Sequence, residues 1–355
     1  MERFIAKIGK GQKAWKDLTW EEAKEAMRLL IEQRATPVQV GAFLAAMRIK
    51  VESVTELAAF TAAARTYVPP VPVPVPVVDL PTYGAKRETF HALVGAAVIA
   101  AAGGAAVLLH GHEGEAGRRN AATLLHHLHV PTDLAAQGAA EQVGAHGIAY
   151  LDIALYHPPI AKHLELSREL GLRTLFHGVA RLLNPARART QVLGLAHPPY
   201  LEKSSEALGM LGGPRALILL GVEGEPELSI AAPTRLVERQ GDRVEPMLLR
   251  PMDLGFAPGT RRDMAAPADE AALLTRILGN QIPGGPRDWV LMNAALLLYA
   301  AGRAPSIRAA VPLVRQILES GAAARKLRDL ASAQASPASR TQPGAEAAPA
   351  RESAA

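Results

Sequence analysis

One stretch, residues 78–111, constrains the fold of this chain most strongly. It reads VDLPTYGAKRETFHALVGAAVIAAAGGAAVLLHG, which is a short apolar strand, a turn, an alanine-rich helix and a second strand. Units of this kind build α/β folds, and they place phosphate-sized ligands at the amino end of the helix. A phosphate cradle needs small residues in the turn, but this turn offers Tyr83, Lys86 and Arg87 with a single glycine, Gly84.

The first part of the chain has the spacing of short amphipathic helices. Three candidate start signals precede apolar residues at helical intervals: Thr19 with Glu22, Thr36 with Pro37, and Ser53 or Thr55. We therefore expect residues 1–68 to form a small helical domain. Residues 69–78 then alternate valine and proline, a pattern that favours polyproline II and indicates a linker.

The longer part of the chain alternates short apolar strands with helical segments. Candidate strands are found at residues 105–110, 147–155, 217–221, 227–236 and 243–249. Candidate helices are found at residues 119–128, 160–170, 269–281, 288–301 and 306–320. This alternation predicts an α/β domain over 79–330 with a mixed or parallel sheet flanked by helices. Residues 331–355 contain almost nothing apolar to bury, and we expect a disordered tail.

Composition narrows the functional class. The chain has 355 residues and 49% hydrophobic content, which is enough for a real core, and it contains no cysteine. Disulfides, thiolate nucleophiles and cysteine metal sites are therefore excluded. The first residues contain no apolar run typical of a secretion signal, and no run reaches the roughly 18 residues of a membrane-spanning helix. We expect a soluble cytoplasmic protein without a membrane partner.

Positive charge gathers near the start of the chain. Residues 1–50 carry ten Lys or Arg against six Asp or Glu. Four of the lysines recur every three residues: Lys7, Lys10, Lys13 and Lys16. Such a segment can neutralise several nucleic-acid phosphates, and it can equally be an ordinary solvated segment. The net charge of +5 is too mild to decide between them.

Three stretches carry a recognisable family pattern. They are the helical segment that begins LTWEEAKEAMRLLIEQRATPVQVGAFLAAMRIK, the segment HPPIAKHLELSRELGLRTLFHGVARLLNPA at 157–186, and GVEGEPELS at 221–229. Together they resemble the anthranilate phosphoribosyltransferase family, which shares its fold with pyrimidine nucleoside phosphorylases. The resemblance spans about residues 5–325. It implies a small helical domain, completed by helices from about 157–190, a large α/β domain, and a homodimer formed through the helical domains.

The residues that carry the family's chemistry depart from its pattern. Where active members have a GTGGDG turn and then TFN, this chain has PTYGAK and then Thr89-Phe90-His91. The family's HGNR becomes His110-Gly111-His112-Glu113, and Ala116-Gly117 replaces a pair of serines. The arginine that contacts the anthranilate carboxylate aligns with Ser167. The resemblance thus implies lost ligands for phosphoribosyl pyrophosphate, which argues against the parental reaction and leaves the catalytic residues unknown.

The resemblance also implies that the magnesium site of active family members is incomplete in this chain. The Asp-Glu pair that holds magnesium in active members becomes Pro226-Glu227. We expect no metal and no cofactor; only a transferase with an altered donor would use Mg²⁺, with Glu223 and Glu227 as weak candidate ligands. Five histidines lie between residues 110 and 129: His110, His112, His126, His127 and His129. Their spacing is not that of a zinc ligand set, so we interpret them as solvated or capping residues.

The PTYGAKR turn is similar to a motif close to PSYNGARK in a divergent paralogue subfamily of these transferases. Members of that subfamily are implicated in sequence-independent nucleic-acid binding. The resemblance and the basic residues together predict a nucleic-acid or phosphate site at Lys7, Lys10, Lys13, Lys16, Tyr83, Lys86, Arg87, Arg118 and Arg119. Tyr83 would stack on a base or sugar. A solvated basic loop that caps the helix is the simpler interpretation of the same turn.

The ligand cleft is expected to be shaped by Thr82, Gly84, Thr89, His110, Gly111, His157 and Arg168. Two functions remain open at this point. The first is sequence-independent binding of DNA or RNA by a basic cleft of the homodimer. The second is a glycosyl or phosphoribosyl transferase with a different donor or acceptor, in which Lys86 and Arg87 stabilise a departing pyrophosphate.

Overall fold

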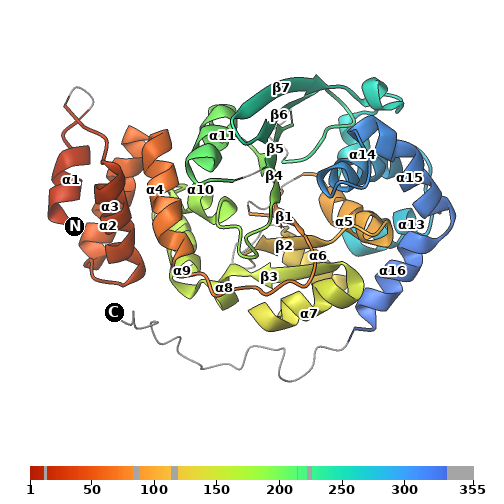
Figure 1. Cartoon of the computed structure of the whole chain (residues 1–355), viewed down its shortest axis with the longest axis horizontal. Coiled ribbons are helices and arrows are strands. Elements are labelled where there is room, and N and C mark those ends of the chain that lie inside the picture. The colour runs from red at the N-terminus through yellow and green to blue at the C-terminus, as the bar shows by residue number, and fades with distance from the viewer. Residues whose placement is uncertain are drawn as a thin grey trace.

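A computed structural model describes residues 1–11, 14–83, 86, 88–112, 119–213, 215–221 and 226–333. Its centre is a seven-stranded sheet in the order β3-β2-β1-β4-β5-β6-β7 (Figure 1). The strands are β1 (Val78–Pro81), β2 (Val107–Gly111), β3 (Ile148–Asp152), β4 (Thr190–Leu195), β5 (Arg215–Leu220), β6 (Thr234–Gln240) and β7 (Arg243–Leu249). Strands β1 to β5 are parallel, and β6 and β7 extend the sheet antiparallel. The predicted mixed α/β sheet is therefore confirmed.

The two faces of the sheet bury different helices, because successive side chains of a strand point to opposite faces. Leu109 of β2 belongs to one core, which includes residues of α5 (Ala92–Ala102), α6 (Ala121–His127), α13 (Glu270–Leu278), α14 (Gly285–Ala300), α15 (Ile307–Glu319) and α16 (Ala322–Ala331). Leu108, its neighbour, belongs to the other core, with α7 (Ala136–His146), α8 (Ile153–Tyr156), α9 (Pro158–Glu169), α10 (Phe176–Arg181) and α11 (Tyr200–Met210). Two short turns of helix, η1 (Pro251–Leu254) and α12 (Arg261–Met264), complete the α/β part.

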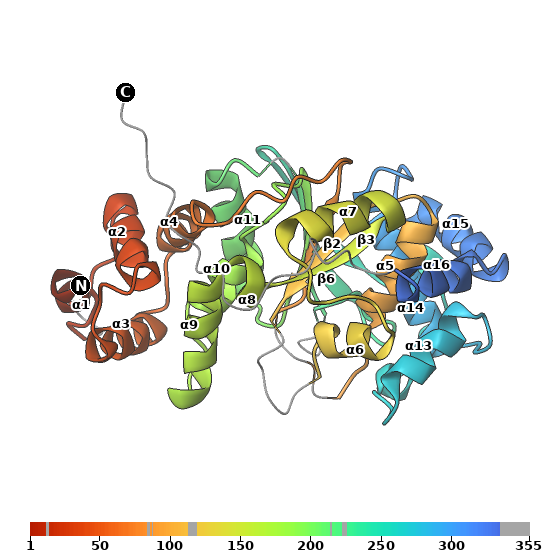
Figure 2. The same ribbon diagram turned by 90° about the horizontal axis from the view of Figure 1, so that it is seen from below.

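The small helical domain lies at the end of the molecule opposite α15 and α16 (Figures 1 and 2). It contains α1 (Glu2–Ile8), α2 (Trp20–Ile31), α3 (Pro37–Lys50) and α4 (Val54–Arg65). The predicted starts at Thr19, Thr36 and Ser53 are confirmed, and each forms a capping box with the residue three positions later. Helix α1, which buries Phe4 and Ile8, was not predicted.

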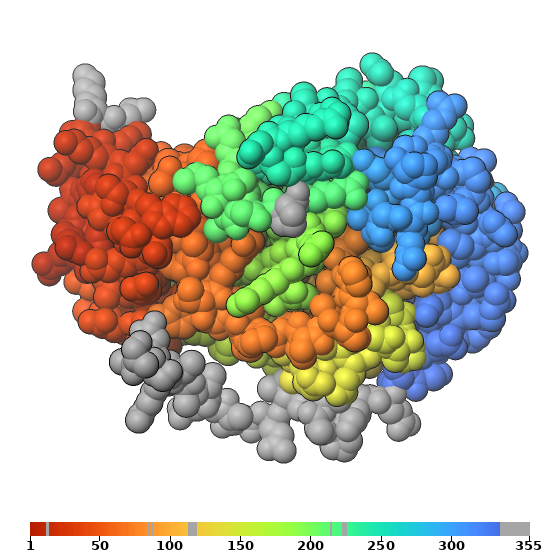
Figure 3. All heavy atoms as spheres, viewed as in Figure 1, coloured from red at the N-terminus to blue at the C-terminus, as the bar shows by residue number. Residues whose placement is uncertain are grey.

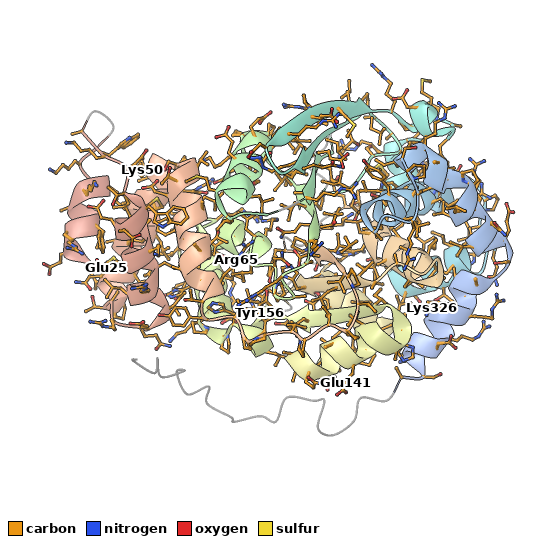
Figure 4. All side chains as sticks on the ribbon, viewed as in Figure 1. Glu25, Lys50, Arg65, Glu141, Tyr156 and Lys326 are labelled. Carbon is orange, nitrogen blue, oxygen red and sulfur yellow. The ribbon has the colours of Figure 1, made fainter. Side chains whose placement is uncertain are left out.

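Helices from the middle of the chain pack on this domain. The Nε2 atom of His157, at the start of α9, lies 3.2 Å from the Ala64 carbonyl oxygen of α4. The Nε2 atom of His163 lies 3.1 Å from the Leu30 carbonyl oxygen of α2. Arg65, labelled in Figure 4, donates to the Leu182 carbonyl oxygen from Nε at 3.1 Å and Nη2 at 2.6 Å. These buried polar contacts fix the two parts of the chain against each other.

One predicted strand is wrong. The segment expected to begin a strand at residue 227 consists of turns from 226 to 233, and β6 starts only at Thr234. Side chains of α14 take over the backbone groups there: Asn293 Oδ1 accepts from the Leu228 amide at 2.9 Å, and Trp289 Nε1 donates to the Leu228 carbonyl at 2.5 Å. The segment therefore needs no sheet neighbour. The predicted tail begins to fall outside the described residues after 333.

None of the helices within the described residues is long and apolar enough to cross a membrane.

Strain is visible at the end of α3. Val51 has φ of 63° and ψ of 128°, a conformation that suits glycine and not a β-branched residue, and its side chain is 43% exposed. We expect Val51→Gly to raise the free energy of unfolding by about 1 kcal/mol, because relief of about 1–3 kcal/mol of strain exceeds the entropic cost of glycine. Urea unfolding followed by circular dichroism measures this.

Val38→Gly is the matched control for this change. Val38 lies in the first turn of the same helix and is 81% exposed, so its removal should cost stability by about 0.5–1 kcal/mol. A loss of stability in both variants would mean that Val51 is not strained.

Candidate ligand site at the carboxyl edge of the sheet

The strand order makes the carboxyl end of β1 the topological switch point of the sheet. The neighbours of β1 are β2 and β4, both parallel to it, and the chain crosses to opposite sides of β1 to reach them. Ligands of open α/β sheets bind at such a switch point, beyond the carboxyl ends of the strands. The turn with Tyr83 and Lys86 follows β1 directly, so it lies where a ligand would be expected.

Lys86 points into the protein. Its ammonium Nζ lies 2.6 Å from Glu227 Oε1, donates to the Phe90 carbonyl oxygen at 2.8 Å, and sits 4.8 Å from the centre of the Trp289 ring. Both side chains of the pair are only 2% exposed. The expectation that Lys86 contacts phosphates is therefore wrong in this conformation, because a buried carboxylate neutralises its charge.

Tyr83 is also buried, at 4% exposure. Its hydroxyl lies 2.7 Å from the hydroxyl of Tyr156, labelled in Figure 4, and 3.1 Å from His110 Nδ1. Its ring meets the His110 ring edge to face at 5.3 Å. Burial, with the Tyr156 hydroxyl as a further cause, raises the pKa of Tyr83 well above the usual value. The predicted stacking on a base is wrong here, because the ring is enclosed by protein.

A polar chain continues from His110 into the sheet. His110 Nε2 lies 3.2 Å from Asp79 Oδ1 in β1, although the two atoms are not aligned for a hydrogen bond. Asp79 Oδ2 accepts from Gln191 Nε2 in β4 at 2.9 Å. His110 is fully buried, so it supports the end of β1 from within rather than lining an open cleft.

His112 lies between two carboxylates beyond the end of β2. Its Nδ1 atom is 3.7 Å from Asp152 Oδ1, and its Nε2 atom is 3.6 Å from Glu165 Oε1. Neither ring nitrogen has a hydrogen-bond partner among the described residues. Asp152 also accepts from the Ala154 amide at 2.7 Å and so caps α8. The imidazole of His112 therefore has a carboxylate near each ring nitrogen.

Basic side chains form a strip along one end of the helical domain. Lys10, Lys16 and Arg48 are exposed, and none has an ion pair with a described residue. Lys50, labelled in Figure 4, holds Asp17 at 2.5 Å, which brings the segment after Lys16 against the end of α3 beside Arg48. Arg48 shares a cavity wall with Arg173, just before α10. We call Lys10, Lys16, Arg48 and Arg173 the basic strip.

Both parts of the chain match models of known protein families. The model of the glycosyl transferase family helical bundle domain matches residues 2–67, and that of the glycosyl transferase family a/b domain matches residues 76–324. The anthranilate phosphoribosyltransferase of Roseiflexus castenholzii is 36% identical over 318 residues, which cover 88% of this chain and 94% of the relative. The chain belongs to the anthranilate phosphoribosyltransferase family.

Other anthranilate phosphoribosyltransferases are similar to this chain over most of their length. The Anaeromyxobacter anthranilate phosphoribosyltransferase (strain K) is 36% identical over 345 residues, covering 95% of this chain and all of the relative. The crystal structure of the Thermus thermophilus enzyme is 32% identical with a TM-score of 0.81, covering 89% of this chain and 96% of that one. The yeast enzyme in complex with PRPP and Mg has a TM-score of 0.80 at 19% identity, covering 93% and 97%, which shows the fold alone.

Magnesium, which this family implies, does not fit the described residues. Glu227 Oε1 is held at 2.6 Å by the Lys86 ammonium, and a divalent cation at the same carboxylate would meet a buried positive charge. No group of three or more candidate metal ligands exists within the described residues. Glu223 lies outside them. We therefore derive no metal-dependent step for this family member.

The other predicted cleft residues lie as follows. Thr82 donates to the His110 carbonyl at 3.1 Å, and a side chain at Gly111 would collide with the Thr82 and Tyr150 hydroxyls. Thr89 is buried, and its hydroxyl has no partner among the described residues. Arg168 is exposed on α9. His157 is buried in the contact with Ala64 and not in a cleft, which corrects that prediction.

The remaining basic residues that the sequence predicts for the site differ in their surroundings. Lys7 is paired with Glu22 at 2.5 Å, and this hydrogen bond holds the pKa of the Glu22 carboxyl below its usual value. Lys7 is thus engaged within the helical domain. Arg119 is partly exposed, and its carbonyl accepts from the Lys86 amide at 3.0 Å. Four of the predicted site residues lie outside the described residues: Lys13, Gly84, Arg87 and Arg118.

Proposed function

We propose that this family member binds nucleic acid without sequence preference, through phosphate contacts along the basic strip, and does not carry out magnesium-dependent phosphoribosyl transfer. It belongs to the divergent branch of the family in this proposal and acts in the cytoplasm. The observation that carries it is the strip itself: the exposed side chains of Lys10, Lys16 and Arg48 form no ion pair with a described residue, and the half-buried Arg173 lies beside Arg48 in the wall of one cavity.

The burial of Lys86 and Tyr83 supports the statement that this protein does not carry out magnesium-dependent phosphoribosyl transfer. Glu227 is the acidic residue that the family pattern assigns to metal, and here it neutralises Lys86. Tyr83 fills space at the end of β1. A donor with a pyrophosphate would have to displace a buried ion pair before it could bind, which costs several kcal/mol.

The placement of the basic strip supports the proposed binding of nucleic acid. Arg48 at the end of α3 and Arg173 before α10 line one cavity, so the strip reaches the junction of the helical domain with the α/β domain, where Figure 3 shows the red and orange surface meeting the green surface. Arg and Lys side chains hold backbone phosphates by charge and read no bases. About three such contacts give a salt slope near −0.9 per phosphate, so affinity should fall roughly 40-fold between 50 and 200 mM salt.

A homodimer would double this surface. The exposed apolar residues Val38 and Ile49 on α3, at 81% and 72% exposure, support pairing through the helical domains. Two strips on one particle raise the apparent affinity for a long strand by effective concentration, without any new contact.

Fluorescence anisotropy with mixed-sequence DNA and RNA oligonucleotides tests the proposal. We expect salt-dependent binding with little sequence preference, and a Lys10→Ala, Lys16→Ala variant should bind roughly tenfold more weakly, with its salt slope reduced by about 2. The control is Arg276→Ala, Arg308→Ala, which removes the same charge from exposed positions on α13 and α15. Absent binding at 50 mM salt, or equal weakening by the control, would contradict the proposal.

A transferase with an altered donor or acceptor is the second candidate. It is supported by His112 between Asp152 and Glu165, because a histidine at the carboxyl edge of the sheet can move a proton in a transfer reaction. Calorimetry with phosphoribosyl pyrophosphate, with and without Mg²⁺, separates the two functions. Tight binding and release of pyrophosphate in the presence of an aromatic amine would favour the transferase.

A further inference from the structure

A cavity of about 50 Å³ lies between the helical domain and the α/β domain. Its wall combines side chains from α3, from the segment before α10, from α10 and from the end of β4. Those used below are Arg48, Arg173, Thr174, Arg181 and His197. The volume is that of roughly four waters or of one tetrahedral oxyanion.

The cavity wall has an excess of positive charge. Arg48, Arg173 and Arg181 are contributed by three separate segments, and one carboxylate, Glu52, lies nearby and accepts from the Tyr200 hydroxyl at 2.7 Å. The three arginines also act on His197: its pKa is lowered, first by burial of its ring and then by their charges. Side chains of like charge gather in this way where an anion offsets their repulsion.

A buried hydroxyl marks the inner wall. Thr174 is 6% exposed, and its Oγ1 atom has no hydrogen-bond partner among the described residues. Its neighbour Arg181 is 9% exposed and is oriented by two backbone contacts, from Nη1 to the His177 carbonyl at 2.9 Å and from Nη2 to the Tyr83 carbonyl at 2.5 Å. An unsatisfied buried hydroxyl is unfavourable, so a ligand oxygen that accepts its hydrogen bond offsets that cost on binding.

We propose that this cavity binds one phosphate group, as inorganic phosphate or as the end group of a phosphomonoester, held by Arg48, Arg173 and the Thr174 hydroxyl with Arg181 behind them. Three guanidinium groups match a dianion better than a single carboxylate, and guanidinium forks pair well with phosphate oxygens. A phosphate or a phosphomonoester end group carries close to two negative charges and offers three terminal oxygens, whereas a phosphodiester carries one charge and offers two, so the three guanidinium groups favour the former. The site is thus distinct in its ligand from nucleic-acid binding on the strip, although Arg48 and Arg173 border both.

The test is isothermal titration calorimetry of the full chain with sodium phosphate, against sodium acetate and sodium chloride at the same ionic strength. We expect saturable binding of phosphate alone. Arg48→Gln should weaken it at least tenfold and Thr174→Val about threefold or more. Arg168→Gln, which removes an exposed arginine of α9 outside the cavity wall, should leave it unchanged. A parallel titration with glycerol 3-phosphate identifies the source: tighter binding than phosphate points to a monoester, and equal or weaker binding to the free anion.

The Thr174→Val protein should be as thermally stable as the wild type, because the substitution removes a hydroxyl that has no hydrogen-bond partner among the described residues. Weaker phosphate binding by this variant would therefore not reflect unfolding. Absent binding of both phosphate compounds, undiminished binding in both cavity variants, or equal loss in Arg168→Gln would overturn the proposal. The nucleic-acid function is tested separately, because Thr174→Val should leave oligonucleotide affinity unchanged. Phosphate binding without oligonucleotide binding would support the phosphate cavity and refute the proposed nucleic-acid binding. Oligonucleotide binding without phosphate binding would support the nucleic-acid function and refute the phosphate cavity.

Discussion

Replacement of Lys86 by methionine should lower the free energy of unfolding by about 3–5 kcal/mol, because it leaves the Glu227 carboxylate buried without a counter-charge. Methionine keeps the length of the side chain and its packing on Trp289, so the loss reports on charge more than on volume. Urea unfolding at pH 7, with fluorescence and circular dichroism recorded together, measures the change.

The double variant Lys86→Met, Glu227→Gln should recover most of that loss. Two neutral side chains of similar size remove the buried charge altogether, and exchange of a buried ion pair for neutral groups is often close to neutral. Lys24→Met is the control, since Lys24 pairs with Glu21 at 3.4 Å on the surface and should change stability by less than about 1 kcal/mol. A Lys86→Met protein as stable as the wild type would mean that the pair does not form and that Lys86 is available to ligands.

Acid should destabilise the protein through His157. This side chain is 1% exposed, and burial lowers its pKa from 6.5 to about 4. The unfolded chain therefore binds a proton between these values that the folded chain excludes, so stability falls as the pH drops below 6.5. His157 alone should contribute a loss of about 2 kcal/mol between pH 7 and pH 5 and about 3 kcal/mol by pH 4, and the total loss of the wild type, measured by urea unfolding at each pH, should exceed this contribution.

His157→Gln isolates this contribution. Glutamine can donate to the Ala64 carbonyl as the neutral imidazole does, but it does not titrate, so its stability should fall by about 2 kcal/mol less between pH 7 and pH 5. Part of the acid sensitivity should remain, because burial also lowers the pKa of His163. His126→Gln, at an exposed position of α6, should keep the wild-type pH profile. Identical profiles for His157→Gln and the wild type would contradict the assignment.

Local patterns explain which elements could be predicted. The starts of α2, α3 and α4 follow from capping boxes, in which all interacting groups lie within four residues. Strand β4 was not predicted, because its pairing partners Val78 and Arg215 are distant in the chain. Helix α1 was not predicted, because its seven residues bury only Phe4 and Ile8, and two apolar positions are too few to define a helical period.

The candidate sites depend still more on distant contacts. The turn after β1 stands out in the sequence because it is basic, and because charged residues are rarely buried, the sequence predicts that Lys86 faces a ligand. The structure instead pairs Lys86 with the buried Glu227. The cluster of Arg48, Arg173 and Arg181 was not predicted at all. Arg48 lies on α3, and Arg173 and Arg181 lie within residues 157–186, so neither stretch alone indicates that the three side chains meet at one cavity.

By itself, the sequence determined the family and the division into helical and α/β parts, because these are written in periodicity and in contiguous motifs. Only the tertiary structure decided which charges meet ligands and which meet each other. Glu227 reaches Lys86 through the packing of α14 against the sheet, and a carboxylate at 2.6 Å in a dry core outweighs the preference of a lysine for water.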